Sequence, residues 1–147
     1  MAFLLTSCNQ RKVYDSYQHT SLTGWEKNIH AEFSIPPLKE GGPYQSTVGL
    51  RINGDYPFMS VTLIIEQEKF AKGKPQPVCS RDTINCRLVN ENGKAEGRGL
   101  TYYQYLFPLK IQELAAEDSL HISIQHNMKR EILPGISDVG WRLEKRF

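Results

Sequence analysis

Residues 120–125 read Leu-His-Ile-Ser-Ile-Gln, and this stretch decides the fold class of the chain. Aliphatic residues occupy every second position, and polar residues stand between them. An extended segment with this pattern has one apolar face and one polar face, whereas a helix needs an apolar period near 3.6 residues. Residues 120–125 therefore predict a half-buried β-strand.

Similar strand signals recur along the chain and are separated by turn residues such as Pro36-Pro37, Asn53-Gly54 and Pro134-Gly135. The remaining segments that alternate, or that are rich in aromatic and β-branched residues, are 13–17, 29–35, 47–52, 61–65, 83–88, 101–105 and 139–143. About eight short strands spaced in this way predict an all-β fold. We expect an antiparallel β-sandwich, either immunoglobulin-like or a jelly roll.

Three local expectations accompany this fold. Residues 83–88 place Cys86 on the face that carries Ile84 and Leu88, so Cys86 is expected in the core. Asn92-Gly93 predicts a tight hairpin, because a type I′ turn needs positive φ at both central positions. Only residues 111–117 could form a helix, and it would be barely two turns long.

Composition limits the function classes. The chain has 147 residues, 23% charged and 39% hydrophobic, which is typical of one folded globular domain. The net charge is only +2, and the basic residues are scattered, which argues against a nucleic-acid partner. No stretch after Cys8 approaches the length of an apolar membrane span.

The segment Leu5-Thr6-Ser7-Cys8 fits the lipobox of bacterial lipoproteins, in which the cysteine becomes lipidated. The alternative is an ordinary thiol at a frayed terminus. Residues 1–5 resemble the end of an apolar signal-peptide core, so we expect the natural start to lie upstream. The predicted organisation is a signal-peptide remnant at 1–8, a polar spacer at 9–12 and one sandwich domain at 13–147.

If Cys8 carries lipid, Cys79 and Cys86 are left as a pair in an oxidising compartment. A disulfide between them would stabilise the fold by about 2–3 kcal/mol in the chain-entropy model. The alternative is two free, half-buried thiols. Zinc-type cysteine spacings are absent, so a metal site is not expected.

The sequence contains none of the catalytic motifs for a nucleophile elbow, a zinc protease, a P-loop or a dinucleotide fold. The four histidines are expected on the surface or on strand faces. Carboxylate pairs such as Asp15 with Asp55, or Asp82 with Asp138, are explained more simply as turn residues than as a glycosidase pair. We therefore expect no catalytic residues, no cofactor and no enzymatic activity.

Aromatic residues leave a second class open. Exposed Trp and Tyr side chains could stack on sugar rings, which would make the domain an envelope-anchored carbohydrate-binding sandwich. Cross-strand aromatic pairing explains the same residues. The residues concerned are Trp25, Tyr44, Tyr56, Phe58, Tyr102, Tyr103 and Tyr105.

Several blocks together resemble the GldH family, the gliding-motility lipoproteins of the Bacteroidetes. The ending is the most telling, because residues 125–140 are similar to the family's Q-x-M-R…L-P-G-I-x-D-V-G pattern, with one extra residue before Met128 and Lys129 inserted before Arg130. The other blocks are Cys8 with 13–15, 24–25, 50–51 with 54–57, 82–83 with 86–88, and 92–93 with Gly97 and 99–100. The resemblance covers nearly the whole chain.

The resemblance implies a lipid-anchored accessory protein of the outer membrane, associated with gliding motility and type IX secretion. Its implied partners are the membrane itself and other envelope lipoproteins, and it implies no catalysis. Lipidation maps onto Cys8. Residues 9–12 lack the acidic run that surface-exported lipoproteins tend to carry, so we expect the domain to face the periplasm. A small-molecule ligand is not expected.

Docking is the function left for a domain without an active site. We expect residues 128–140 to form a shaped turn for a partner, with Pro134 and Gly135 fixing its backbone and Arg130 and Asp138 bracing it. The alternative is a purely structural connection into the last strand.

Overall fold

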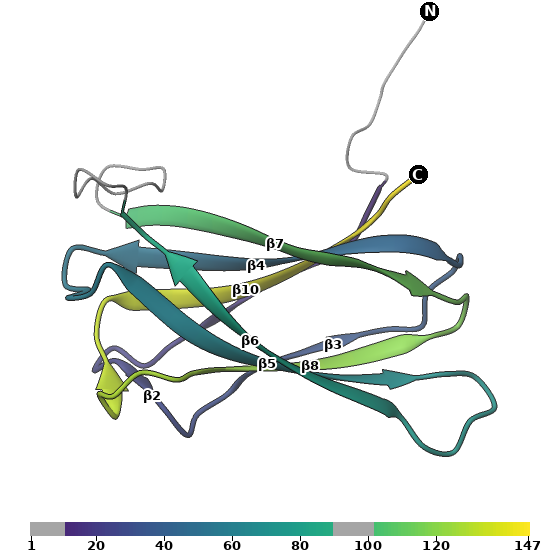
Figure 1. Ribbon diagram of the computed structural model, residues 1–147, viewed down its shortest axis with the longest axis horizontal. Coiled ribbons are helices and arrows are strands. Elements are labelled where there is room, and N and C mark those ends of the chain that lie inside the picture. Colours follow the sequence, from purple (N-terminus) through teal and green to yellow (C-terminus); the bar gives the residue numbers. More distant parts are fainter. Residues whose placement is uncertain (1–10, 90–101) are drawn as a thin grey trace, which may run out of the picture.

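The computed structural model describes residues 11–89 and 102–147, and strands dominate it (Figure 1). Eight of the described strands have five residues or more, as predicted, and two have two residues each. The strands are β1 (Lys12–His19), β2 (Trp25–Glu26), β3 (Ala31–Ile35), β4 (Gly42–Asn53), β5 (Ser60–Phe70), β6 (Val78–Arg87), β7 (Tyr102–Leu114), β8 (Ser119–His126), β9 (Ile132–Leu133) and β10 (Ile136–Lys145).

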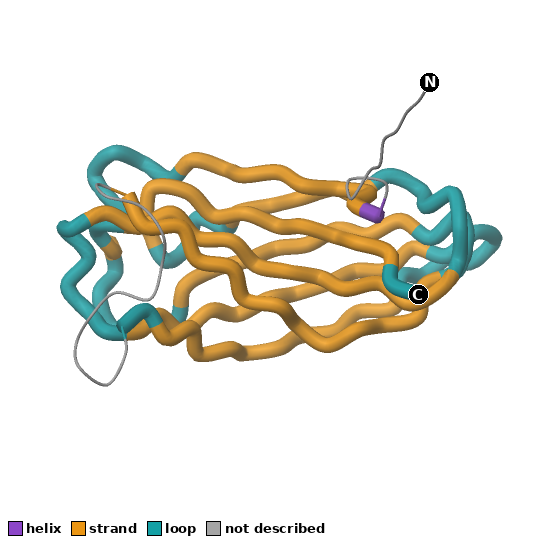
Figure 2. Tube along the Cα trace, turned by 90° about the horizontal axis from the view of Figure 1, so that it is seen from above, coloured by secondary structure: helices purple, strands orange, loops and turns teal. Residues whose placement is uncertain are grey.

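Two four-stranded antiparallel sheets stack face to face, in the orders β1-β10-β4-β7 and β3-β8-β5-β6 (Figures 1 and 2). The pairing is nested around the β5–β6 hairpin, since β4 pairs with β7, β3 with β8 and β1 with β10. This rolled-up arrangement is the jelly-roll topology. The prediction of an all-β sandwich is confirmed, and the jelly roll replaces the immunoglobulin-like alternative.

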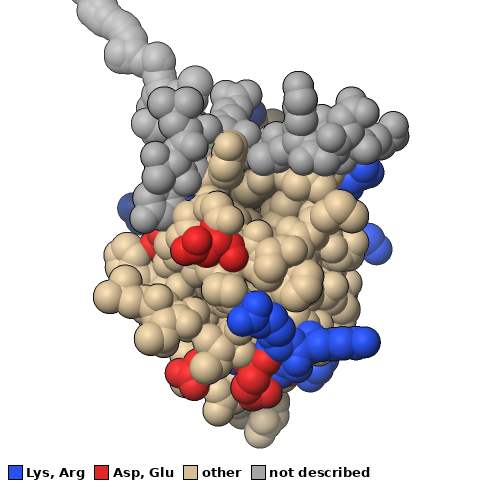
Figure 3. All heavy atoms as spheres, turned by 90° about the vertical axis from the view of Figure 1, so that its left-hand side faces the viewer, with Lys and Arg blue, Asp and Glu red and all other residues tan. Residues whose placement is uncertain are grey.

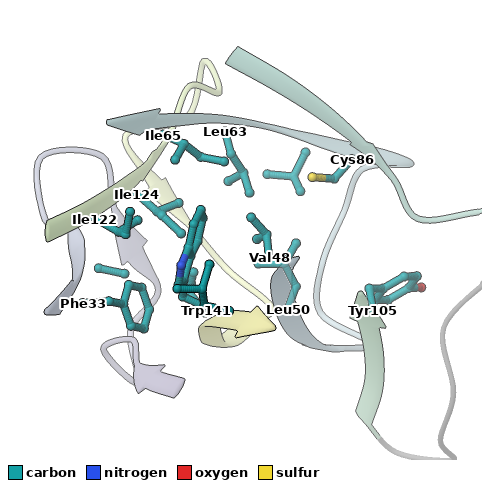
Figure 4. Close-up of a cluster of buried hydrophobic side chains, with 14 of the residues drawn as sticks. Phe33, Val48, Leu50, Leu63, Ile65, Cys86, Tyr105, Ile122, Ile124 and Trp141 are labelled. Atoms are coloured by element: carbon teal, nitrogen blue, oxygen red, sulfur yellow. The ribbon is translucent and has the colours of Figure 1, made fainter. Parts of the chain in front are cut away.

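The alternating segments supply the core between the sheets, as their period predicts. Val48, Leu50, Leu63, Ile122 and Ile124 are fully buried. Figure 4 shows these side chains from both sheets meeting around Trp141. The inward orientation predicted for Cys86 is also confirmed, because its side chain is buried.

The predicted helix at residues 111–117 is wrong. Residues up to Leu114 continue β7, where Leu114 lies opposite Gly42 and Ile111 opposite Gln45. Tertiary pairing with β4 has overridden the weak local helix preference. The chain then turns where the Asp118 carboxylate accepts a hydrogen bond from Ala115 N–H at 2.9 Å. The predicted Asn92-Gly93 hairpin lies outside the described residues.

The two ends of the sandwich differ in what they carry. Lys12, at the start of β1, lies opposite Glu144 near the end of β10, so the chain enters and leaves the described domain at one end (Figure 1). His19, at the other end of β1, lies opposite Asp138. We call this second end the distal end. Among the described residues, no helix could cross a membrane.

Candidate functional site

Three of the blocks that resemble the GldH family come together at the distal end, although they are far apart in sequence. Trp25 of β2 pairs with Leu133 of β9. The ring of His126 packs edge-on against the indole of Trp25, with 5.3 Å between their centroids. Asn53 N–H donates to Gly135 O at 2.8 Å. The fold therefore assembles residues 24–25, 50–57, 125–130 and 133–140 into one structure.

Gly135 is the pivot of this assembly. Its φ is +91°, a conformation that L side chains rarely adopt. A Cβ atom built on Gly135 would lie 2.3 Å from Tyr56 N and 2.5 Å from Tyr56 Cα, so the two backbones meet without room for a side chain. The Tyr56 hydroxyl donates to Ser60 O at 2.7 Å, and burial raises the pKa of that hydroxyl. The predicted fixing of the backbone at Pro134-Gly135 thus has a physical basis here.

Hydrogen bonds from side chains and from the backbone hold residues 136–138, which follow Gly135, in place. Thr20 Oγ1 donates to Ile136 O at 2.6 Å, and Thr20 N–H donates to Ser137 O at 3.0 Å. The Ser137 hydroxyl lies 2.8 Å from Asp138 Oδ2. The imidazole of His19 lies against Asp138 Oδ1, which has no other partner among the described residues. Asp138 is buried and braces the turn, as predicted.

Arg130 does not brace the turn as predicted. Its side chain is exposed and makes no ion pair with the described residues, and the imidazole beside Asp138 is that of His19. The charge of Arg130 therefore remains free at the surface of the distal end.

His126 packs beneath the site. The four histidines were expected on the surface or on strand faces, and the sequence analysis did not identify His126 as a buried support of this site. It is fully buried, and Met128 N–H donates to its Nδ1 at 3.3 Å. Nε2 must then carry the proton and donate to Trp25 O at 3.0 Å. Burial lowers the pKa of His126, and its hydrogen bonds to backbone carbonyls oppose this shift. The signal was available, since His126 continues the inward face of Ile122 and Ile124.

The loops at this end line an open groove with a volume of about 650 Å³, which we call the distal groove. It is lined by residues 19–24, 134–138, Arg51, Asn53 and Asp55. Leu22 stands fully exposed on its rim. Basic and acidic side chains both occur on this end of the molecule (Figure 3).

Two glycines on neighbouring strands lie close to the groove. Gly49 and Gly140 lie opposite each other, and the ring of Tyr17 covers both. The Arg51 guanidinium lies 3.9 Å from the centroid of that ring. Burial raises the pKa of Tyr17, while the charge of Arg51 opposes this shift. Arg51 is thereby held at the groove by a cation–π contact.

Of the two alternatives left open for Cys79 and Cys86, the structure has the free thiols and not the disulfide. Cys79 and Cys86 are both free, with Cys79 exposed and Cys86 buried. They lie on the same strand, β6, with seven residue steps between them. An extended strand places them roughly 23 Å apart, far beyond the ~7 Å between Cα atoms that a disulfide tolerates. Burial raises the pKa of the Cys86 thiol to about 12.

The carboxylates, possible metal ligands and tryptophans considered in the sequence analysis lie as follows. Asp138 lines the distal groove, whereas Asp82, which was considered with it as a possible glycosidase carboxylate pair, lines a different groove. In residues 11–89 and 102–147, no group of three His, Cys, Asp or Glu residues could hold a metal ion. Both tryptophans are 2% exposed, which counts against a stacking platform for sugars. Cys8, the predicted lipidation site, lies outside the described residues.

Comparison with known proteins decides the family. The family model described as GldH lipoprotein matches residues 12–143, which includes every strand of the distal groove. The chain belongs to the GldH lipoprotein family. It is 28% identical over 152 residues to the gliding motility lipoprotein GldH of Flavobacterium johnsoniae, covering 99% of this chain and 92% of the relative.

A second relative agrees with this family assignment. The chain is 30% identical to the GldH homolog of Christiangramia forsetii, covering 97% of this chain and 89% of the relative. Among solved structures, the Eiger TNF of S. frugiperda matches with a TM-score of 0.37 at 10% identity, over 93% of this chain and 94% of that one. The resemblance to the GldH family is confirmed, and the family's name implies attachment to a membrane through a lipid.

Proposed function

We propose that this GldH protein is an accessory lipoprotein of the gliding-motility and type IX secretion machinery. Lipid on Cys8 holds it at the outer membrane, facing the periplasm, and it docks other envelope lipoproteins without catalysis. Several acyl chains on one cysteine give stable attachment, which a single chain does not. Tethering then raises the effective concentration of the domain near partners in the same membrane.

The observation that carries the docking proposal is that three family-like blocks contribute to one groove, through Gly24, through Arg51 with Asp55, and through residues 134–138. Buried His126 and Asp138 and the close contact of Gly135 with Tyr56 hold these segments in place. Leu22 is exposed at the groove, and Arg130 is exposed at the same end of the sandwich outside the groove lining. Exposed apolar and arginine side chains are common anchors of protein interfaces. The groove also lies at the end away from Lys12, and hence away from the proposed anchor.

Two measurements test the two halves of this proposal. Intact mass of the full-length protein from its native membrane fraction should show a lipid-sized increase on a chain that begins at Cys8. The increase should disappear in Cys8→Ala. An unmodified chain in the membrane fraction would remove the anchor.

Docking is tested by co-purification of envelope proteins with the tagged, full-length chain. Leu22→Ser and Arg130→Ala should lose partners without a change in melting temperature, because both side chains are exposed. Lys72→Ala is the matched control, since Lys72 is exposed in the β5–β6 hairpin, at the other end of the sandwich. Equal partner recovery from Arg130→Ala, Leu22→Ser and Lys72→Ala would contradict docking at the distal groove.

A further inference from the structure

A second groove runs along one side of the sandwich, between β6 of one sheet and β7 of the other. It measures about 560 Å³, and we call it the side groove. Ser46 and Trp141 form its floor, Ile84 and Leu109 contribute apolar wall, and Asp82 and Lys110 lie at its rim. In Figure 1, β6 and β7 separate toward the end where the chain enters.

The floor of the side groove contains two unsatisfied polar atoms. Ser46 Oγ and Trp141 Nε1 have no hydrogen-bond partner in the part of the chain that the structure describes, and both residues are only 2% exposed. Leaving a buried donor unpaired costs about 1–3 kcal/mol, and folded proteins rarely do so. A molecule that placed an acceptor oxygen against these atoms would recover that cost.

The backbone beside these atoms is irregular. Thr47 of β4 lies opposite Pro108, and Gln45 lies opposite Ile111, so Leu109 and Lys110 together face the single residue Ser46. Such a bulge bends the strand and is frequent beside binding sites. Pro108 also lacks an N–H group, which blunts β7 as a pairing edge.

β6 is the more open edge. Among the described residues it pairs only with β5, so its outer backbone N–H and C=O groups have no strand partner. It contains no proline, and Ser80 and Asp82, which point toward the side groove, remain exposed. An extended peptide can add to such an edge through main-chain hydrogen bonds and place alternate side chains in adjoining pockets.

We propose that the side groove binds an extended segment of a partner polypeptide, which adds to β6 and inserts one neutral side chain toward Trp141 and Ser46. That side chain carries an acceptor oxygen, as Asn, Gln, Ser and Thr do. Acidic Asp82 and basic Lys110 both lie at the rim, so together they give no net preference for a charged side chain. The proposal rests on the proposed docking function and names a second surface for it, distinct from the distal groove.

The test uses the full-length Cys8→Ser chain and a displayed library of random ten-residue peptides. Selected peptides should bind wild type about tenfold more tightly than Trp141→Phe or Ser46→Ala, which each remove one of the two unpaired groups. Ser16→Ala, on β1 and outside both grooves, is the control and should bind as wild type does. Trp141 is a core residue, so Trp141→Phe should lower the melting temperature through the cavity it leaves, and peptide binding is therefore compared at a temperature where each variant is folded. Ser46→Ala removes a hydroxyl that has no partner among the described residues, so it should keep a melting temperature close to wild type.

A second readout identifies strand addition. N-methylation along a selected peptide should weaken binding at every second position, since alternate amides pair with a strand edge. Failure to select peptides, binding that is equal in Trp141→Phe, Ser46→Ala and wild type, or N-methyl effects without alternation would each overturn the side-groove proposal. Leu22→Ser and Arg130→Ala should leave peptide binding unchanged, so failure at one groove is distinguishable from failure at the other.

Discussion

Replacing Gly135 with alanine should destabilise the domain more than any ordinary surface substitution. Two terms add at this position. An L residue at φ +91° costs about 1–2 kcal/mol relative to glycine. The new Cβ would also lie 2.3 Å from Tyr56 N, and forcing the backbones apart costs about 1–3 kcal/mol. We expect a loss of about 3 kcal/mol in the free energy of unfolding.

This loss of unfolding free energy corresponds to a fall in melting temperature. An unfolding entropy of about 2.1 cal/mol/K per residue gives roughly 0.3 kcal/mol/K for a chain of this length, so the midpoint should fall by about 10 °C. Thermal unfolding followed by circular dichroism on the Cys8→Ser chain measures it.

Gly73→Ala is the matched control for the contact with Tyr56. Gly73 also has positive φ, +77°, but a Cβ there would meet nothing within 4 Å. Its midpoint should fall by only about 3–6 °C, because the conformational term acts alone. Equal falls in Gly135→Ala and Gly73→Ala would refute the close approach of Gly135 to Tyr56 as the origin of the larger loss.

Three further predictions concern buried groups. The lowered pKa of His126 means that the unfolded chain binds a proton more readily, so stability should fall as pH drops below about 6.5, and His126→Gln should show a shallower fall in denaturant titrations at pH 7 and pH 5. In the Cys8→Ser chain, a thiol reagent at pH 8 should label exposed Cys79 at once and buried Cys86 only in denaturant, whereas a disulfide would leave neither thiol reactive in the native state. Leu50→Ala should cost about 3 kcal/mol of unfolding free energy, and a loss below about 1 kcal/mol would show that the core around it is not tightly packed.

The sequence predicted the strands because their signal is local. Alternation in residues 120–125 identifies β8 and its inward face without knowledge of any partner. The nested pairing could not be read in the same way, since β1 pairs with β10 across almost the whole chain. The helix considered at 111–117 was wrong for the same reason, since the partner strand is distant in sequence. Pairing with β4 imposes the extended conformation on that segment.

The residues named from the sequence for the candidate site stay a prediction as docking residues, but the structure shows what two of them contact. Gly135 and Asp138 were found through the family-like ending of the chain, and the structure gives both a role at the distal groove. The contact of Gly135 with Tyr56 and the contact of Asp138 with His19 join distant segments, so no local sequence pattern predicts these contacts. Arg130 was expected to brace the turn only because it lies in the same block of sequence.

The placement of the distal groove has a mechanical consequence. Lys12 and His19 mark the two ends of β1, which at about 3.3 Å per residue spans roughly 23 Å. If Cys8 holds the domain by the end that carries Lys12, the sandwich acts as a stiff post that lifts the groove at least that far above the lipid headgroups when it stands upright. A partner confined to the bilayer plane could not reach the groove, so the protein that docks there must itself project into the aqueous compartment.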